Sequence, residues 1–526
     1  MKPLRIFIFF VSVALLLFLL AVLFPGQGIT LNPSVHFKFM NLSDLSRSDQ
    51  DRDDLVKELW SASTVTEDPE AEFELPGPES PIVEAPIEDL IVKTLPIKEL
   101  HGKDLPRKDL PRKAPSIEKL PIKPPVVFPA NTDSLKRSVY RISFAEGADD
   151  LLDGFFSELQ GLLGGSVTRT RIMHFGDSQI ENDRMTALIR FRLQKQFGGS
   201  GTGLVPAIPI YGGNMAYRQE QEGEWLRYTF FRKRDSSIKH NVYGVMGAFT
   251  SVPSPRDDQW PSLHYTFNTS RHNGTVDRIR VFLHSYVSEA ALNFEVNDTI
   301  TDTVINIPDG FSVADYRHNA PVKELCLSLD LPQGGRIYGI SFESYRGLQM
   351  DNIAMRGGSG LVFTKMNREQ QMKMMEYLSP GLIILQYGGN VVPYINAARY
   401  QTSFKRELDF MKELCPGVPV IVIGPADMSR KVKGSFESYP GVEPVRDALK
   451  QACMDAGFAF WDLYEAMGGY NSMPSFVKTD PPLANTDYIH FSNLGINLVG
   501  EMFYNALMLE YYEYQSKISN LAAGSN

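Results

Sequence analysis

This sequence has few cysteines and no excess of positive charge. Only three cysteines occur among 526 residues, namely Cys326, Cys415 and Cys453. An odd and widely spaced set provides no disulfide framework and no zinc-ligand spacing, so we expect three free thiols and no metal site. The formal net charge is −9 and the isoelectric point is about 5.6. A nucleic-acid partner is therefore not expected, because such partners require a basic surface.

Long apolar runs are also absent, with one exception near the N-terminus. This run extends from Ile6 to Phe24 and follows Lys2 and Arg5. Its roughly nineteen residues would form about 29 Å of helix, enough to cross a bilayer. No Ala-x-Ala cleavage site follows the run, so residues 1–30 are predicted to be a cytoplasmic stub and an uncleaved transmembrane signal anchor. Cleavage at an atypical site is the alternative.

The next segment, residues 31–133, has the composition of a linker. Prolines recur from Pro69 to Pro129 among charged residues. Short segments nearly repeat, as in Leu105-Pro106-Arg107-Lys108 and Leu110-Pro111-Arg112-Lys113. Proline lacks a backbone donor and disfavours helix at the preceding residue, so the segment is predicted to be extended and disordered. A spacer between membrane and domain is the simplest role. Binding of an anionic wall polymer by the basic half is the alternative.

Strand and helix patterns alternate in two separate stretches, residues 134–203 and 346–515. An apolar strand ends at Ser178 and a helix follows from Glu181. Later strands are predicted at 382–387, 418–423 and 459–463, and helices at 400–414, 442–456 and 493–512. This alternation indicates a parallel sheet covered by helices on both faces, ahead of a C-terminal tail at 516–526. The glycine-rich stretch 198–203 lacks the Lys-Ser/Thr ending of a P-loop, so no nucleotide is expected.

Short alternating runs between turn formers fill residues 204–345. Strands are predicted at 225–231, 241–245, 263–267, 277–284, 291–296, 303–307, 324–331 and 336–342. Several short strands at this spacing are typical of an antiparallel β-sandwich. An all-β module of the carbohydrate-binding kind is therefore expected to interrupt the α/β domain. Its aromatic residues would stack on sugars in that role, although packing in the core is the commoner use.

Four pieces of the α/β stretches carry candidate chemistry. Ser178 follows a strand and needs a base, because a serine hydroxyl is a weak nucleophile on its own. Asp487 and His490, three residues apart before a helix, offer an orienting carboxylate and an imidazole. Asn390 and Gly357 offer an amide and an unobstructed backbone N–H that would stabilise an oxyanion.

These pieces, in this order, resemble the SGNH (GDSL-like) hydrolase family. The resemblance rests on Gly176-Asp177-Ser178-Gln179, Gly357, Gly388-x-Asn390 and Asp487-x-x-His490. It implies a flavodoxin-like three-layer α/β/α domain with Ser178 as nucleophile, His490 as base and then acid, and Asp487 as its orienter. The N–H groups of Ser178 and Gly357 and the side chain of Asn390 would form the oxyanion hole. No cofactor or metal is implied. Gly244-x-x-Gly247-Ala248 also resembles the second piece, so Gly247 is the alternative glycine.

Family members with an inserted β-sandwich resemble cell-envelope carbohydrate or peptidoglycan O-acetylesterases. The expected function is therefore removal of O-acetyl groups from an envelope glycan on the periplasmic side of a bacterial membrane. Gln179 and Val391 depart from the usual leucine and aspartate, which puts the substrate in question more than the catalysis. An O-acetyltransferase using the same residues and a non-catalytic glycan-binding scaffold are the alternatives.

Overall fold

A computed structural model describes most of the chain. The described residues are 29–32, 35–37, 49–62, 139–212, 216–232, 234–254, 260–268, 275–297, 299–394 and 396–524. The apolar run predicted to anchor the chain and the proline-rich part of the predicted linker lie outside these ranges. Within them, no helix combines the length and apolar character needed to span a bilayer.

A six-stranded sheet forms the centre of the α/β part. Its strands run in the order β16 (Gly347–Ala354), β4 (Arg169–Gly176), β17 (Leu382–Gln386), β18 (Val420–Ile423), β21 (Ala459–Trp461) and β3 (Ser143–Phe144). The first five are parallel and β3 pairs antiparallel with β21. Numbered along the chain, the parallel strands have the flavodoxin-like order 2-1-3-4-5. Ligands of such sheets bind at the switch point, which here lies between the carboxyl ends of β4 and β17.

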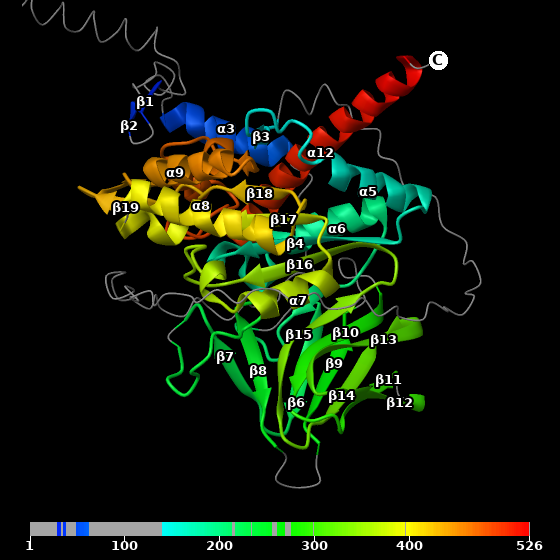
Figure 1. The fold of residues 1–526 in the computed structure, drawn as a ribbon. Coiled ribbons are helices and arrows are strands. Elements are labelled where there is room, and N and C mark those ends of the chain that lie inside the picture. Colours follow the sequence, from blue (N-terminus) through cyan, green and yellow to red (C-terminus); the bar gives the residue numbers. More distant parts are fainter. Residues whose placement is uncertain are drawn as a thin grey trace, which may run out of the picture. The chain divides into compact units, whose positions relative to one another are not determined.

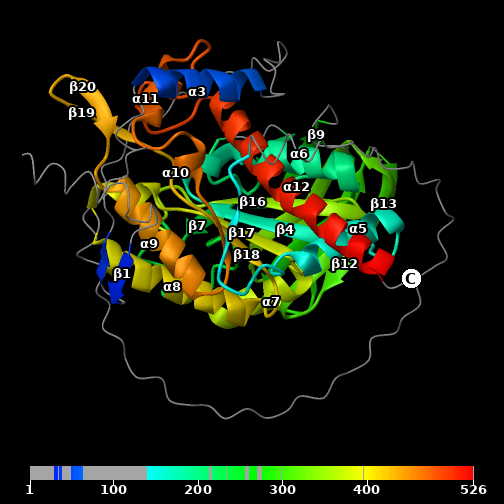
Figure 2. The same cartoon turned by 90° about the horizontal axis from the view of Figure 1, so that it is seen from above.

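Helices cover both faces of this sheet (Figures 1 and 2). One face is covered by α7 (Arg368–Leu378), α8 (Ala397–Leu414) and α9 (Val442–Asp455), and the other by α5 (Asp153–Gly164), α6 (Thr186–Phe197) and α12 (Asn493–Gly524). Successive side chains of a strand point to opposite faces. Accordingly, Ile383 and Leu385 join the core beneath α8, whereas Leu382 and Ile384 join the core beneath α12. Both cores are apolar, which explains why the central strands β17 and β18 are almost entirely apolar in sequence.

Two antiparallel sheets lie between β4 and β16 in the sequence. One has the order β13 (Gly310–Val322), β10 (Val276–Ser285), β15 (Gly335–Glu343), β8 (Ala248–Val252) and β7 (Leu226–Thr229), with β5 (Gly203–Val205) also paired to β15. The other has the order β12 (Thr299–Ile307), β11 (Ala290–Val296), β14 (Glu324–Asp330), β9 (Ser262–Phe267) and β6 (Tyr217–Glu222). Side chains of both sheets, including Leu263, Ile279 and Leu292, meet in a third apolar core.

The strand predicted at residues 241–245 is wrong. This stretch is a turn in which Gly244 has a φ of +71° and its N-terminal neighbour Tyr243 is fully buried. A side chain at Gly244 would collide with Met374 of α7, so the glycine allows a close approach between this turn and the helix. The alternation that suggested a strand comes from Tyr243 and Val245, whose side chains both enter the core beneath α7.

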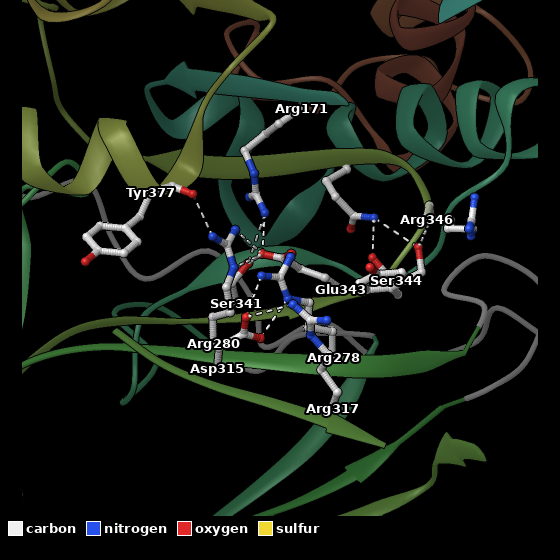
Figure 3. Close-up of polar contacts among 12 residues, drawn as sticks. Arg171, Arg278, Arg280, Asp315, Arg317, Ser341, Glu343, Ser344, Arg346 and Tyr377 are labelled. Atoms are coloured by element: carbon white, nitrogen blue, oxygen red, sulfur yellow. Dashed lines mark hydrogen bonds and ion pairs between the residues drawn. The ribbon is translucent and has the colours of Figure 1, made fainter. Parts of the chain in front are cut away.

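Buried charges join the sandwich to the α/β sheet (Figure 3). Arg171 of β4 pairs with Glu343 of β15 and with Asp351 of β16. Arg280 of β10 also donates to Glu343, at 2.9 Å from its Nε, and to the carbonyl of Tyr377 at 2.7 Å. These side chains are almost fully buried, so each charge depends on its partners in place of water.

The front of the predicted linker is ordered, contrary to the expectation of disorder over residues 31–133. Strands β1 (Ile29–Asn32) and β2 (Val35–Phe37) form a hairpin, and α3 (Asp49–Ala62) is a helix. Val56 of α3 is buried, and Asp53 accepts a hydrogen bond from Ser475 of α11 (Ser472–Lys478). The helix is therefore held by a segment more than 400 residues away, which local composition does not reveal.

Candidate active site

Ser178 lies at the carboxyl end of β4, where the strand turns into the short helix η2 (Ser178–Asp183). Asp177 caps this helix, because its Oδ1 accepts the N–H of Gln179 at 3.0 Å. Ser178 is the first residue of the helix, so its own N–H has no acceptor within it. Arg184 donates to the carbonyl of Ser178 at 2.8 Å and fixes the loop from the other side.

A serine, a histidine and an aspartate converge at this point. The Oγ of Ser178 lies 3.2 Å from Nε2 of His490, although 312 residues separate them. On the other side of the ring, Nδ1 of His490 lies 2.8 Å from Oδ2 of Asp487. Partial burial alone would raise the pKa of Asp487, but hydrogen bonds from His490 and from the backbone of residues 489 and 490 lower it overall. The carboxylate therefore stays ionised and holds the Nδ1 proton.

The histidine loop is fixed to the serine loop and to a neighbouring hairpin. Gln179 donates from Nε2 to the carbonyl of Ile489 at 3.0 Å, which gives the unusual glutamine a structural purpose. The hairpin is formed by β19 (Ser429–Val432) and β20 (Ser435–Ser438). The ring of Phe436 stacks on Tyr488 with centroids 3.6 Å apart, and the N–H of Ser429 donates to the Tyr488 carbonyl. Tyr488 has a φ of +58°, a strained conformation that these contacts hold.

Asn390 reaches the site from η4 (Gly389–Tyr394), directly after β17. Its Nδ2 donates to Oδ2 of Asp177 and to the carbonyl of Gly358, both at 3.1 Å. Burial raises the pKa of Asp177 to about 6, against the effect of the N–H of Gln179 and the nearby positive charges. An ionised Asp177 accepts hydrogen bonds on both oxygens and so orients Asn390.

Gly357 occupies a tight turn after β16. The N–H of Gly358 donates to the carbonyl of Met355 at 2.8 Å, and Gly357 has a φ of +76° at the third position, which defines a type II turn. Within the described chain, the N–H of Gly357 donates to no acceptor. The alternative glycine differs, because the N–H of Gly247 is taken by the carbonyl of Gly244 at 3.2 Å.

No group of His, Cys, Asp and Glu side chains suited to a metal ion occurs among the residues that the structure describes. The three cysteines are free thiols, with Cys326 half-buried and the other two buried. Burial raises the pKa of Cys415 to about 12, so this thiol is held in its unreactive protonated form.

Comparison with known proteins gives structural matches alone. No known protein family and no curated protein matches the sequence. Among solved structures, a peptidoglycan O-acetylesterase is similar over 68% of this chain and 96% of its own, with 20% identity and a TM-score of 0.57. A putative GDSL-like lipase from Parabacteroides merdae (15% identity, covering 31% of this chain and 74% of its own) and a family two carbohydrate esterase from Cellvibrio japonicus (8%, covering 47% and 89%) have TM-scores of 0.25 and 0.18. The last two scores are too low to define a shared fold.

The strand order and the converging side chains define a doubly wound α/β protein with a serine, a histidine and an aspartate at the switch point of its sheet. More specifically, its fold is similar to that of the peptidoglycan O-acetylesterase, so the resemblance expected from the sequence is confirmed at the level of the fold. The five site residues predicted from the sequence all lie at the switch point or on turns beside it: Ser178, Asp487, His490, Asn390 and Gly357.

Proposed function

We propose that this protein is a serine esterase that removes O-acetyl groups from an envelope polysaccharide or peptidoglycan through an acyl-enzyme. The observation that carries the proposal is the hydrogen-bonded series from Ser178 through His490 to Asp487 at the sheet's switch point. A nucleophile, a base and an orienting carboxylate in this geometry are the requirements of acyl transfer. Fold similarity to an enzyme that is itself a peptidoglycan O-acetylesterase supports the choice of an acetylated glycan.

The proposed reaction begins when Nε2 of His490 takes the proton of Ser178 as its Oγ attacks the acetyl carbonyl. Asp487 keeps the proton on Nδ1, so the imidazole presents its lone pair to the serine and is stabilised when it becomes positive. His490 then protonates the departing sugar oxygen. Water, activated by the same imidazole, releases acetate and regenerates Ser178.

The negative oxygen of the tetrahedral intermediates needs hydrogen-bond donors. In our proposal, the N–H groups of Ser178 and Gly357 supply two of them. Asn390 supplies a third when one of its N–H groups leaves the carbonyl of Gly358, while its bond to Asp177 keeps the amide in place. Gly357 is preferred over Gly247 because the N–H of Gly247 already donates to the carbonyl of Gly244.

Acetate release from acetylated peptidoglycan and from acetylated neutral glycans tests the proposal. Ser178→Ala and His490→Ala should each lower kcat at least about 1,000-fold, because the triad acts as a unit. Ser516→Ala on the exposed side of α12 and His318→Ala in the sandwich are matched controls that should leave the rate unchanged. Equal glycan binding by wild type and Ser178→Ala, without turnover by either, would instead favour a scaffold.

The location of the activity is part of the proposal. Lys2, Arg5 and the apolar run up to Phe24 support a signal anchor that places the esterase on the periplasmic side of a bacterial membrane. Protease added to intact spheroplasts should then degrade the protein. Complete protection that persists until the cells are lysed would contradict this location.

A further inference from the structure

One side chain from the segment that leads into the sandwich reaches the turn that carries Gly357. Tyr211 lies between β5 and β6, and its hydroxyl accepts the N–H of Arg356 at 2.6 Å. The same hydroxyl donates to the carbonyl of Ala354, the last residue of β16, at 3.3 Å. Burial raises the pKa of Tyr211, so the phenol keeps the proton that it donates. Tyr211 therefore contacts the backbone immediately before Gly357 twice.

The side chain of Arg356 links this turn to the serine loop. Its guanidinium lies over the ring of Tyr211, 4.9 Å from the centroid, and forms a two-pronged ion pair with Glu181. Glu181 is buried and stands three residues after Ser178 in η2. One connected set, Tyr211 to Arg356 to Glu181, thus joins the loops that carry two of the proposed oxyanion donors.

We propose that Tyr211 is a positioning residue that fixes the direction of the Gly357 N–H in the oxyanion site. This inference rests on the proposed esterase function. In a type II turn, the peptide between the second and third residues has no hydrogen bond within the turn. The direction of its N–H therefore depends on how firmly the residue before it is held, and here the Tyr211 hydroxyl holds Arg356. A misplacement of about 1 Å at a reacting centre can lower the rate about 100-fold.

A purely structural role for Tyr211 predicts a different outcome. The loss of one buried hydroxyl would then lower the melting temperature without changing how the folded protein stabilises a transition state. A positioning role instead lowers kcat and leaves KM nearly unchanged on a small ester, because the donor acts on the oxyanion and not on the ground-state substrate.

The test compares Tyr211→Phe with Tyr265→Phe in the full-length protein. Tyr211→Phe keeps the ring, and with it the stack on Arg356, but removes both hydroxyl bonds. Tyr265 is the matched control, because its hydroxyl donates to Ala207 of the same segment at 3.4 Å without contacting the turn. We expect kcat for a small acetyl ester to fall about 10- to 100-fold in Tyr211→Phe and to change less than twofold in Tyr265→Phe. Melting temperatures of both variants establish that they are folded.

A second measurement is the rate at which a fluorophosphonate probe labels Ser178, followed by mass spectrometry. The phosphoryl oxygen of the probe uses the oxyanion donors but no ester is hydrolysed, so labelling should slow in Tyr211→Phe as turnover does. Wild type that is labelled but releases no acetate would refute the acetylesterase function while the labelling comparison still decides the role of Tyr211. Equal labelling and equal kcat in wild type and Tyr211→Phe would refute the positioning role. Wild type that is neither labelled nor active would overturn both.

Discussion

At the scale of single residues, Asp177 links the pH to the stability of the site. Its pKa is about 6 in the folded protein, against an ordinary value near 3.8, because burial disfavours its charge. A raised carboxyl pKa means that the group's contribution to stability decreases as pH rises from about 4 to about 6, by roughly 3 kcal/mol. Asp177→Asn removes this titration, so its stability relative to wild type should increase by about that amount over the same interval. Denaturant unfolding between pH 4 and 7 measures the difference.

Asp150→Asn is the control for this experiment, since Asp150 is exposed and its side chain makes no hydrogen bond within the described residues. Its stability relative to wild type should stay constant across the interval. A parallel stability profile for Asp177→Asn and wild type would mean that Asp177 titrates alike in the folded and unfolded protein.

Residue types and their spacing were enough to select the triad, because a nucleophile at a strand end and a closely spaced Asp-x-x-His pair restrict the choices strongly. They were not enough to find the residues that hold the site together. Glu181 and Arg184 lie within six residues of Ser178. Two charged residues so soon after an apolar strand could have indicated that they hold the serine loop in place. Tyr211 gave none, because only the folded chain brings it to Arg356.

At the scale of elements, hairpin β19–β20 supports the loop that carries His490. Phe436 stacks on Tyr488, whose positive φ costs of order 1–3 kcal/mol unless neighbouring contacts stabilise it. Phe436→Ala should therefore loosen the histidine loop and lower kcat about 10-fold, while Phe436→Tyr should restore the wild-type rate. Steady-state kinetics on a small acetyl ester measures both.

Tyr286→Ala is a suitable comparison, because Tyr286 is an exposed aromatic side chain in the sandwich. It should retain full activity. If Phe436→Ala and Tyr286→Ala hydrolyse the ester at the same rate, the hairpin has no part in positioning the histidine.

The bounds of helices and strands were predicted well where burial leaves a clear apolar pattern in the sequence. Elements were missed where that pattern is weak or where the residues they pack against are distant in the sequence. The strands at 382–387 and 418–423 were predicted within two residues, since both faces of each strand are buried. β13 was missed, because its sequence alternates poorly and it lies at the edge of its sheet. α3 was missed because α11, the helix that it packs against, lies more than 400 residues away in the sequence.

At the scale of the whole molecule, the buried charge cluster joins the sandwich to β4, the strand that leads to Ser178. Burial alone would raise the pKa of Glu343, but the guanidinium groups of Arg171 and Arg280 lower it below its usual range. Because the pKa of Glu343 is lower in the folded protein, its carboxylate stabilises the fold fully at any pH above its pKa in the unfolded chain, about 4.3. This stabilisation is lost as the pH falls through its pKa in the folded protein. Glu343→Gln leaves the arginines with one negative charge fewer, so unfolding at pH 7 should become easier by about 3–5 kcal/mol.

The size of that effect should shrink as the pH falls below about 4.3, because the unfolded wild-type chain then binds a proton at Glu343 and the variant has no such group to titrate. Denaturant unfolding at pH 7 and at about pH 3 measures both differences. Glu324→Gln, an exposed change on β14, is the control and should lie within about 0.5 kcal/mol of wild type at both values. A Glu343→Gln protein as stable as wild type at pH 7 would mean that hydrogen bonds, not charge, hold the two parts together. In that case the arginines need only acceptor oxygens, which the amide still provides.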